Sequence, residues 1–262
     1  MQKRNMTKNR RVLQGLCFYV GVILVWQLVF WLGTSVVGLW KPYAFPSPLG
    51  VVESFGRQLG DGSLVLAVLQ SLKRCILGFC ISLVVGAVAG VAITHFAFLK
   101  RNLKPLMLGI QTLPSICWVP FAILWFGLKE SAILFVVVMG SVFSVALAIE
   151  DAFSQVPPLY IKAARTMGTG KSQLYRYVML PAALPGIVSG MKQSWSFAWR
   201  ALMSGEVMSS FVGLGFSLMT GRDMADINQV MAVMIVIIVL GILIEKFVFG
   251  KIEGKLKKKR GL

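Results

Sequence analysis

Long apolar runs dominate the chain, and short polar stretches separate them. Residues 12–40 contain no charged side chain, and five further apolar runs follow. A helix needs roughly 20 apolar residues to cross the ~30 Å hydrocarbon core of a bilayer. The pattern predicts an all-α integral membrane protein with six transmembrane helices, over residues 12–33, 75–94, 105–128, 131–149, 181–205 and 227–249.

Composition points the same way. Of the 262 residues, 56% are hydrophobic and only 14% are charged, whereas soluble domains carry about 25% charged residues. So many long uncharged runs argue against a buried soluble core. The basic N-terminal segment leads into a long apolar run without a small-residue cleavage site, so we expect an uncleaved first span.

The polar segments predict the orientation of the chain. A basic arm covers residues 1–11, a coupling loop covers residues 152–180, and a basic tail covers residues 250–262. Together with the loop at 95–104, and counting the tail from Lys246, they hold 19 of the 27 Lys and Arg residues. Because Lys and Arg accumulate in cytoplasmic loops, we expect both termini and the coupling loop in the cytoplasm, with the tail touching anionic lipid. The net charge of +17 then reflects topology and not nucleic-acid binding.

Two local patterns add detail. The segment 41–62 begins with closely spaced prolines, which break a helix, and continues as a short amphipathic stretch that we expect at the membrane interface. Gly86 and Gly90 lie four residues apart in the second span, a spacing that lets helix backbones approach closely.

The stretch Gly170-Lys171-Ser172 matches the end of a phosphate-binding loop, but the motif is incomplete. The first glycine of G-x-x-x-x-G-K-[ST] would fall on Arg165, and no buried strand precedes the stretch. We therefore do not expect this chain to bind a nucleotide there.

A helical interpretation fits the same segment. A helix can start after Pro157 and Pro158, and Gly168 allows a sharp turn with positive φ. One face of this helix would carry Leu159, Ala163, Thr166 and Met167. A second short helix leads to Pro181, where the fifth span begins. This helix–turn–helix joins the fourth and fifth spans and would act on both as a lever.

The spacing of this segment resembles the signature loop of bacterial ABC importer permeases, written EAA, three residues, G, nine residues, I-x-LP. The residues that match are Ala163, Ala164, Gly168, Leu180 and Pro181. Lys162 stands where the family usually has Glu, and Val178 stands where it has Ile. The stretches FPSP, SLKRCILGF, LPAALPGI and GRDMADINQVMAVM also resemble the family, and its nitrate, sulfonate and taurine branch in particular.

This resemblance implies a transporter driven by partner proteins. Such permeases form a dimer, usually of two identical chains in this branch, above two cytoplasmic ABC ATPase subunits, and an extracytoplasmic binding protein delivers the substrate. ATP and Mg²⁺ are used by the ATPase, so no cofactor or metal is expected on this chain. ATP binding draws the docking helices together and switches the pore. The residues implied in ATPase coupling are Lys162, Ala163, Ala164, Gly168, Leu180 and Pro181.

Charged residues in the fifth span indicate a substrate pathway. A charge inside a bilayer is costly and usually marks a pathway or an ion pair. Lys192 and Arg200 would favour an anion; alternatively, Arg200 reaches the membrane interface, and Glu206 pairs with Arg200. The candidate pathway residues are Lys192, Trp195, Trp199, Arg200 and Glu206.

Together these features predict the permease subunit of an ATP-driven, binding-protein-dependent importer in the bacterial cytoplasmic membrane. The expected substrate is a small anion such as nitrate, a sulfonate or taurine, and a heterocyclic vitamin precursor is an alternative. A membrane-embedded enzyme would need a catalytic cluster, and the sequence offers no Ser/His/Asp set or metal-ligand cluster. A secondary transporter or channel would have no use for the docking loop.

Overall fold

The computed structural model describes residues 2–38, 40, 41 and 44–259. These residues form helices and turns, and no strand occurs among them. The predicted all-α class is thus confirmed for this part of the chain, while Met1 of the basic arm and residues 260–262 of the basic tail lie outside it. The chain divides into a first unit, Met1–Val65 with Ser217–Val236, and a second unit, Leu66–Phe216 with Ile237–Leu262.

The first unit holds a short helix that is fixed at both ends. Its helices are α1 (Gln2–Trp31), a π-helical extension (Leu32–Val36) and α2 (Pro48–Gly60). Ser47 caps α2, because its Oγ accepts a hydrogen bond from Gly50 N at 3.0 Å. Ser47 N donates to Asn228 Oδ1 at 3.0 Å, and Arg57 pairs with Asp226 at 2.8 Å. The short helix expected in segment 41–62 is therefore present.

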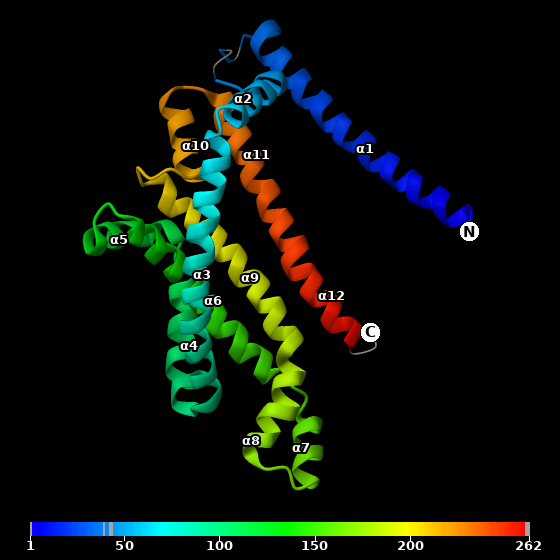
Figure 1. Cartoon of the computed structure of the whole chain (residues 1–262), viewed down its shortest axis with the longest axis vertical. Coiled ribbons are helices and arrows are strands. Elements are labelled where there is room, and N and C mark those ends of the chain that lie inside the picture. The colour runs from blue at the N-terminus through cyan, green and yellow to red at the C-terminus, as the bar shows by residue number, and fades with distance from the viewer. Residues whose placement is uncertain (1, 39, 42–43, 260–262) are drawn as a thin grey trace. The chain divides into compact units, whose positions relative to one another are not determined.

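The second unit contains most of the remaining helices (Figure 1). They are α4 (Ala97–Gln111), α5 (Val119–Phe126), α6 (Glu130–Ser154), α7 (Pro158–Thr166), α8 (Lys171–Gln173), α9 (Leu180–Val207) and α12 (Gly250–Lys259). Three further helices have residues in both units: α3 (Ser63–His95), α10 (Leu214–Asp223) and α11 (Ile227–Ile244). A π-helical segment, Leu174–Met179, joins α8 to α9, and another, Glu245–Phe249, joins α11 to α12.

Four helical segments are long and apolar enough to cross a membrane among the described residues. They are Leu13–Val36, Ser63–His95, Glu130–Ser154 and Ile227–Leu256. The third predicted span, 105–128, is not one straight helix. Its helix already begins at Ala97, where we expected a loop, and it breaks before a second piece, Ser115–Phe126, that is bent by 101° against the first.

Pro114 explains the position of this break. It lies between the two pieces with φ −55° and ψ 137°, outside helical geometry. A proline has no N–H to donate and restricts the residue before it to extended backbone, so α4 cannot continue through this point. By length and composition, the described residues offer four spans, or five if the bent pair forms one. The prediction of six spans is thus confirmed only as several apolar helices.

The fifth predicted span is α9, which has 28 residues and a length of ~42 Å at 1.5 Å per residue. It is not among the four apolar segments, because Lys192 and Arg200 lower its hydropathy. The helix α9 begins at Leu180 and continues directly from the π-helical segment Leu174–Met179, whereas the sequence predicted a new helix at Pro181.

Antiparallel α6 and α9 pack along a seam of small residues. A Cβ added at Gly190 would overlap the Ala148 methyl group, and one at Gly140 would overlap Ala201. Between these contacts Ser194 Oγ donates to Ser144 Oγ at 2.9 Å. Small residues let helix backbones approach in a membrane. The spacing of Gly186 and Gly190 could have predicted this seam.

The glycine motif of α3 has the predicted effect. A Cβ added at Gly86 would meet Val145 Cβ at 2.7 Å, and one at Gly90 would meet the Ala146 carbonyl oxygen at 2.6 Å. Both neighbours belong to α6. The prediction of close backbone packing at Gly86 and Gly90 is confirmed, and α6 is the partner.

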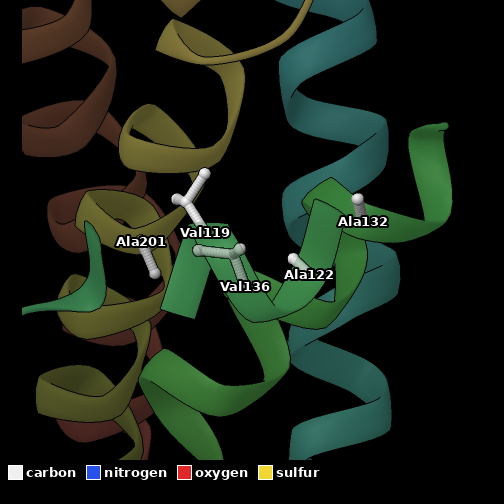
Figure 2. Close-up of a cluster of buried hydrophobic side chains, with 5 residues drawn as sticks. All are labelled: Val119, Ala122, Ala132, Val136 and Ala201. Carbon is white, nitrogen blue, oxygen red and sulfur yellow. The ribbon is translucent and has the colours of Figure 1, made fainter. Parts of the chain in front are cut away.

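A cluster of buried apolar side chains fixes the bent segment against the seam. Figure 2 shows that its members come from α5, α6 and α9. They are Val119, Ala122, Ala132, Val136 and Ala201. The side chains are short, so the three helices approach closely in the second unit.

Candidate coupling helix and transport pathway

The segment α7 has sharply defined ends. Pro157 and Pro158 start it, with Pro158 in the first turn, where a missing N–H costs nothing. At the other end Gly168 has φ +77°. Gly168 N donates to Arg165 O at 3.0 Å and Thr169 N donates to Ala164 O at 3.2 Å. This pair of hydrogen bonds is the Schellman motif, in which glycine relieves the strain of positive φ.

The residues of α7 differ in burial. Ala164 is buried, and α7 lies beside the π-helical segment Leu174–Met179 at one end of the second unit (Figure 1). Leu159, Tyr160, Ala163 and Met167 are exposed, with Met167 85% exposed. Lys162 is exposed, and it forms no ion pair within the described part of the chain. Exposed apolar side chains of this kind on a polar segment are typical of a protein–protein contact.

Leu180 and Pro181 lie where the π-helical segment becomes α9. Pro181 has no N–H to donate to the preceding turn, and a widened turn of this kind adapts to the missing bond. Leu180 is 42% exposed. The signature residues thus lie at the two ends of the connection from α7 to α9, with Ala163 and Gly168 at one end and Leu180 and Pro181 at the other.

The sequence left open a pairing of Glu206 with Arg200, and the structure does not show this pair. Its carboxylate accepts hydrogen bonds from Ser71 Oγ at 2.7 Å, Arg74 Nη1 at 2.9 Å and Gly215 N at 3.0 Å. Arg74 Nη2 also pairs with Glu130 at 2.6 Å. We call Ser71, Arg74, Glu130 and Glu206 the Glu206 cluster. It joins α3, α6 and α9, and the Glu206 carboxylate is fully buried.

A second buried carboxylate, Glu150, lies near the end of α6. Lys100 Nζ lies 2.7 Å from its Oε1, and Lys104 contacts its Oε2. Lys104 also pairs with Asp151 at 2.9 Å. We call Lys100, Lys104, Glu150 and Asp151 the Glu150 cluster. A carboxylate at the end of an apolar helix would ordinarily face water, but the Glu150 side chain is fully buried, and the lysines of α4 contact it.

The remaining candidate pathway residues divide between two sides of α9. Lys192 pairs with Glu245 at 2.7 Å. Trp195 and Trp199 are buried and line a mainly apolar groove, and Arg200 and Glu245 line the same groove. Arg200 also reaches a second, more polar cavity on the other side, beside Ser204. The structure thus does not bring the five candidates together at one site.

Comparison with known proteins identifies the family. A family model described as binding-protein-dependent transport system inner membrane component matches residues 82–258. The chain belongs to this family. It is therefore the non-catalytic membrane subunit of an ABC importer, and ATP hydrolysis belongs to a separate subunit, as the signature loop predicted.

Individual relatives are similar in sequence to this permease along most of its length. SsuC of Bacillus subtilis, an aliphatic sulfonates transport permease protein by name, is 28% identical over 260 residues, covering 99% of this chain and 92% of SsuC. The nitrate import permease protein NrtB of Synechocystis is 26% identical, with 78% and 77% covered. The taurine transport system permease protein TauC of Escherichia coli is 25% identical, with 86% and 84% covered.

The fold of the permease matches a solved structure as well. A chain from inward-facing conformations of the MetNI methionine ABC transporter superposes with a TM-score of 0.64. It is 23% identical, and the match covers 74% of this chain and 96% of that chain. This likeness supports the ABC permease fold.

Sequence reasoning missed the partners of the charged residues. Arg74 and Glu206 were visible as charges next to apolar runs, and the cost of an unpaired charge in a membrane demands a partner for each. Their separation of 132 residues hid the pairing. Gln111, which lines two cavities of the second unit, carries no charge and gave no signal.

Proposed function

We propose that this permease imports a small oxyanion, as one of two identical membrane subunits above two cytoplasmic ABC ATPases. Membership of the importer family carries the transport part of this proposal. The relatives named above are named for sulfonates, nitrate and taurine. These substrates all present several oxygen atoms around a small charged centre. A binding protein outside the membrane would deliver the substrate.

The proposed topology has six crossings, with both termini and α7 in the cytoplasm of a bacterium. Four helices supply four crossings; the bent pair of α4 and α5 and the long helix α9 supply the others. The distribution of Lys and Arg supports this orientation, since 19 of 27 lie in segments on one side.

The exposed face of α7 would dock into a groove of the ATPase. Ala163 leaves room for close approach, and Leu159 and Met167 offer apolar contact area. The Schellman turn at Gly168 fixes the direction in which the chain leaves α7. ATP would be bound and hydrolysed on the partner with Mg²⁺, and α7 would pass the movement to α6 and α9.

The proposed pathway follows α9. Of the five residues predicted to line it, Arg200 reaches the polar cavity, whereas Lys192 is paired with Glu245 and Glu206 is enclosed in its cluster. Trp195 and Trp199 would support the helix from the apolar groove. A cation beside a membrane cavity favours an anion over a neutral heterocycle.

Reconstitution tests the proposal. The permease, its ATPase and its binding protein would be placed in liposomes, and ATP-dependent uptake of radiolabelled nitrate, taurine, ethanesulfonate and a neutral pyrimidine would be compared. We expect that at least one oxyanion is taken up, and that its uptake requires both ATP and the binding protein. Uptake of the pyrimidine alone would contradict the substrate class, and uptake without ATPase would contradict the importer.

A further inference from the structure

A polar cavity lies in the second unit between the bent segment, α6 and α9. Its volume is 430 Å³, within the range of about 300–1,000 Å³ typical of small-molecule sites. The polar residues that line it are Gln111, Thr112, Ser115, Arg200 and Ser204. Trp118, Phe143 and Phe197 form much of the remaining wall. Arg200 is the one charged residue among the described residues that line it.

The guanidinium of Arg200 keeps most of its hydrogen-bonding capacity. Its Nε donates to Ser196 O at 3.3 Å, and the group lies over the Phe197 ring at 4.7 Å. Neither terminal nitrogen has a hydrogen-bond partner, and no carboxylate pairs with it, within residues 44–259. The neighbouring cation on α9, Lys192, is in contrast held by Glu245 at 2.7 Å.

In the proposed topology, Arg200 lies within the hydrocarbon core and not at its edge. The adjacent residue Ala201 contacts Gly140 of α6. Gly140 is ten residues from Glu130 and fourteen from Ser154 at the two ends of α6, or ~15 Å and ~21 Å along the axis. In a hydrocarbon core of ~30 Å this depth leaves the head group too far from water to reach the interface easily. A cation that is unpaired at this depth marks a route for ions or substrate.

Gln111 connects this cavity to a second one. The second cavity has a volume of 320 Å³ and lies between α4, α6 and α9. Its polar lining includes Asp151, Gln155 and Gln193, and Gln111 lines both cavities. Gln111 Oε1 is buried without a hydrogen-bond partner within the described residues. A buried amide oxygen without a donor is unfavourable by about 1–3 kcal/mol. A bound molecule that donates to this oxygen would remove the cost, and so would a rotation of the amide that points its NH₂ group into the cavity.

We propose that Arg200 and Gln111, with the Ser115 and Ser204 hydroxyl groups, form a binding site for a small oxyanion halfway along the transport route. Ser115 Oγ and Ser204 Oγ lie 3.1 Å apart across the cavity wall. This inference rests on the proposed import function and specifies where the anion pauses. Arginine matches the geometry of a planar or tetrahedral oxyanion by donating two parallel hydrogen bonds.

The donor set also explains why the site would hold an anion only transiently. One cation is aided by hydroxyl groups and one amide, and no second cation lines the cavity among the described residues. A transport site must bind strongly enough to admit the substrate and weakly enough to release it. Asp151 lines the adjoining cavity and would disfavour an anion there, so release would follow passage beyond Gln111.

Cysteine labelling tests the site without requiring transport. The full chain, with Cys17, Cys75, Cys80 and Cys117 replaced by alanine and with S204C added, would be placed in lipid nanodiscs. Rates of labelling by an anionic and a cationic methanethiosulfonate reagent would then be compared. We expect R200Q to lower the anionic-to-cationic rate ratio about tenfold. R101Q makes the same change of charge on α4 outside the cavity and should leave the ratio unchanged.

Protection by an anion distinguishes a binding site from a charged passage. Ethanesulfonate should slow labelling of S204C by neutral N-ethylmaleimide when Arg200 is present, and should not do so in R200Q. An unchanged rate ratio in R200Q, or equal protection in both chains, would overturn the site. A lowered ratio without protection would also overturn it, because it would show an electric field without binding.

The two proposals fail separately. Wild-type uptake of an oxyanion with labelling indifferent to Arg200 would remove the site and leave the import function. Arg200-dependent labelling and protection without uptake of any oxyanion would leave the site and remove the proposed substrate class.

Discussion

Glu206 and Glu150 are both fully buried carboxylates of the second unit, but different partners hold them. Glu206 is held by Arg74, whose side chain is only 4% exposed, and by Ser71 and the Gly215 backbone amide. Glu150 accepts a hydrogen bond from Ser154 Oγ at 2.6 Å, but its cationic partners, Lys100 and Lys104, are 49% and 26% exposed. The cation beside Glu206 is thus enclosed, whereas the cations beside Glu150 are flexible and reach water.

This difference separates a fixed end of the permease from an adaptable one. The rigid fork of an arginine sets the geometry of its ion pairs, whereas lysine is a point charge on a flexible stem. The Glu206 cluster therefore fixes α3 to α9. The Glu150 cluster joins α4 to the end of α6, and α7 begins four residues after Ser154. The end that adjoins α7 is thus the more adaptable of the two.

Removing the cation from each cluster should give the largest contrast. Arg74→Met leaves Glu206 buried and uncompensated, which should destabilise the permease by about 3–5 kcal/mol. Lys104→Met leaves Glu150 with Lys100, and we expect a loss of about 1 kcal/mol or less. Thermal unfolding of both variants in the same detergent measures the difference. Equal losses would remove the distinction between the clusters.

Replacing a glycine by alanine should also destabilise the protein more beside Glu206 than at the end of α6 near Glu150. A Cβ at Gly215 would meet Glu206 Cβ at 2.6 Å and Val207 N at 2.9 Å. Backbone cannot move aside as a side chain can, so Gly215→Ala should cost about 1–3 kcal/mol. At the other end, a Cβ at Gly186 would meet Ala152 at 3.0 Å, and we expect a smaller loss. The comparison uses the same unfolding assay, and a larger loss at Gly186 would contradict it.

Neutralising the adaptable carboxylate should affect transport more than folding. Glu150→Gln weakens the link from Lys100 and Lys104 to α6, and changes along such a link alter coupling by about 0.5–2 kcal/mol. We expect uptake per ATP hydrolysed to fall about twofold to tenfold in liposomes. Glu53→Gln is the control, because Glu53 is an exposed carboxylate of α2 that belongs to neither cluster and lines neither polar cavity. If both variants couple normally, the Glu150 cluster has no part in transmission.

Salt should reveal the smallest effect. Ion pairs that reach water are screened at high ionic strength, whereas buried pairs are screened much less. Raising KCl from about 0.1 M to 1 M, where the Debye length falls from about 10 to 3 Å, should shrink the stability difference between wild type and Lys104→Met. The stability difference between wild type and Arg74→Met should not change with salt. If it shrinks as much as the difference for Lys104→Met, Arg74 is hydrated.

Local features of this permease followed from sequence because their causes are local. Pro157 and Pro158 start α7 and Gly168 ends it, and each acts through its own backbone restriction. Gly86 and Gly90 marked a packing face in the same way, since their spacing places them on one side of a helix. The signature spacing then connected these features to a family.

The remaining features depend on contacts across long distances in the chain. Pro114 predicted an interruption, but the bend of 101° depends on how Ala122 packs against Val136 of α6. Arg74 and Glu206 meet only because α3 and α9 lie side by side. The level of Arg200 beside Gly140 of α6 likewise came only from the structure, through the contact of Ala201 with that glycine.

The central claim is that α7 transmits the movement of the ATPase, and two glycines provide a matched test. Gly168 has φ +77° and Gly170 has φ −66°. A Cβ has open space at Gly168 and meets only Gln173 Oε1, at 3.9 Å, at Gly170. Valine therefore strains the backbone at the first position and fits at the second.

The measurement is oxyanion uptake per ATP hydrolysed by the complete importer in liposomes. We predict that Gly168→Val lowers this ratio by about tenfold, within the usual range of coupling between sites, while Gly170→Val stays within about twofold of wild type. Normal uptake per ATP in Gly168→Val would contradict a transmitting role for α7.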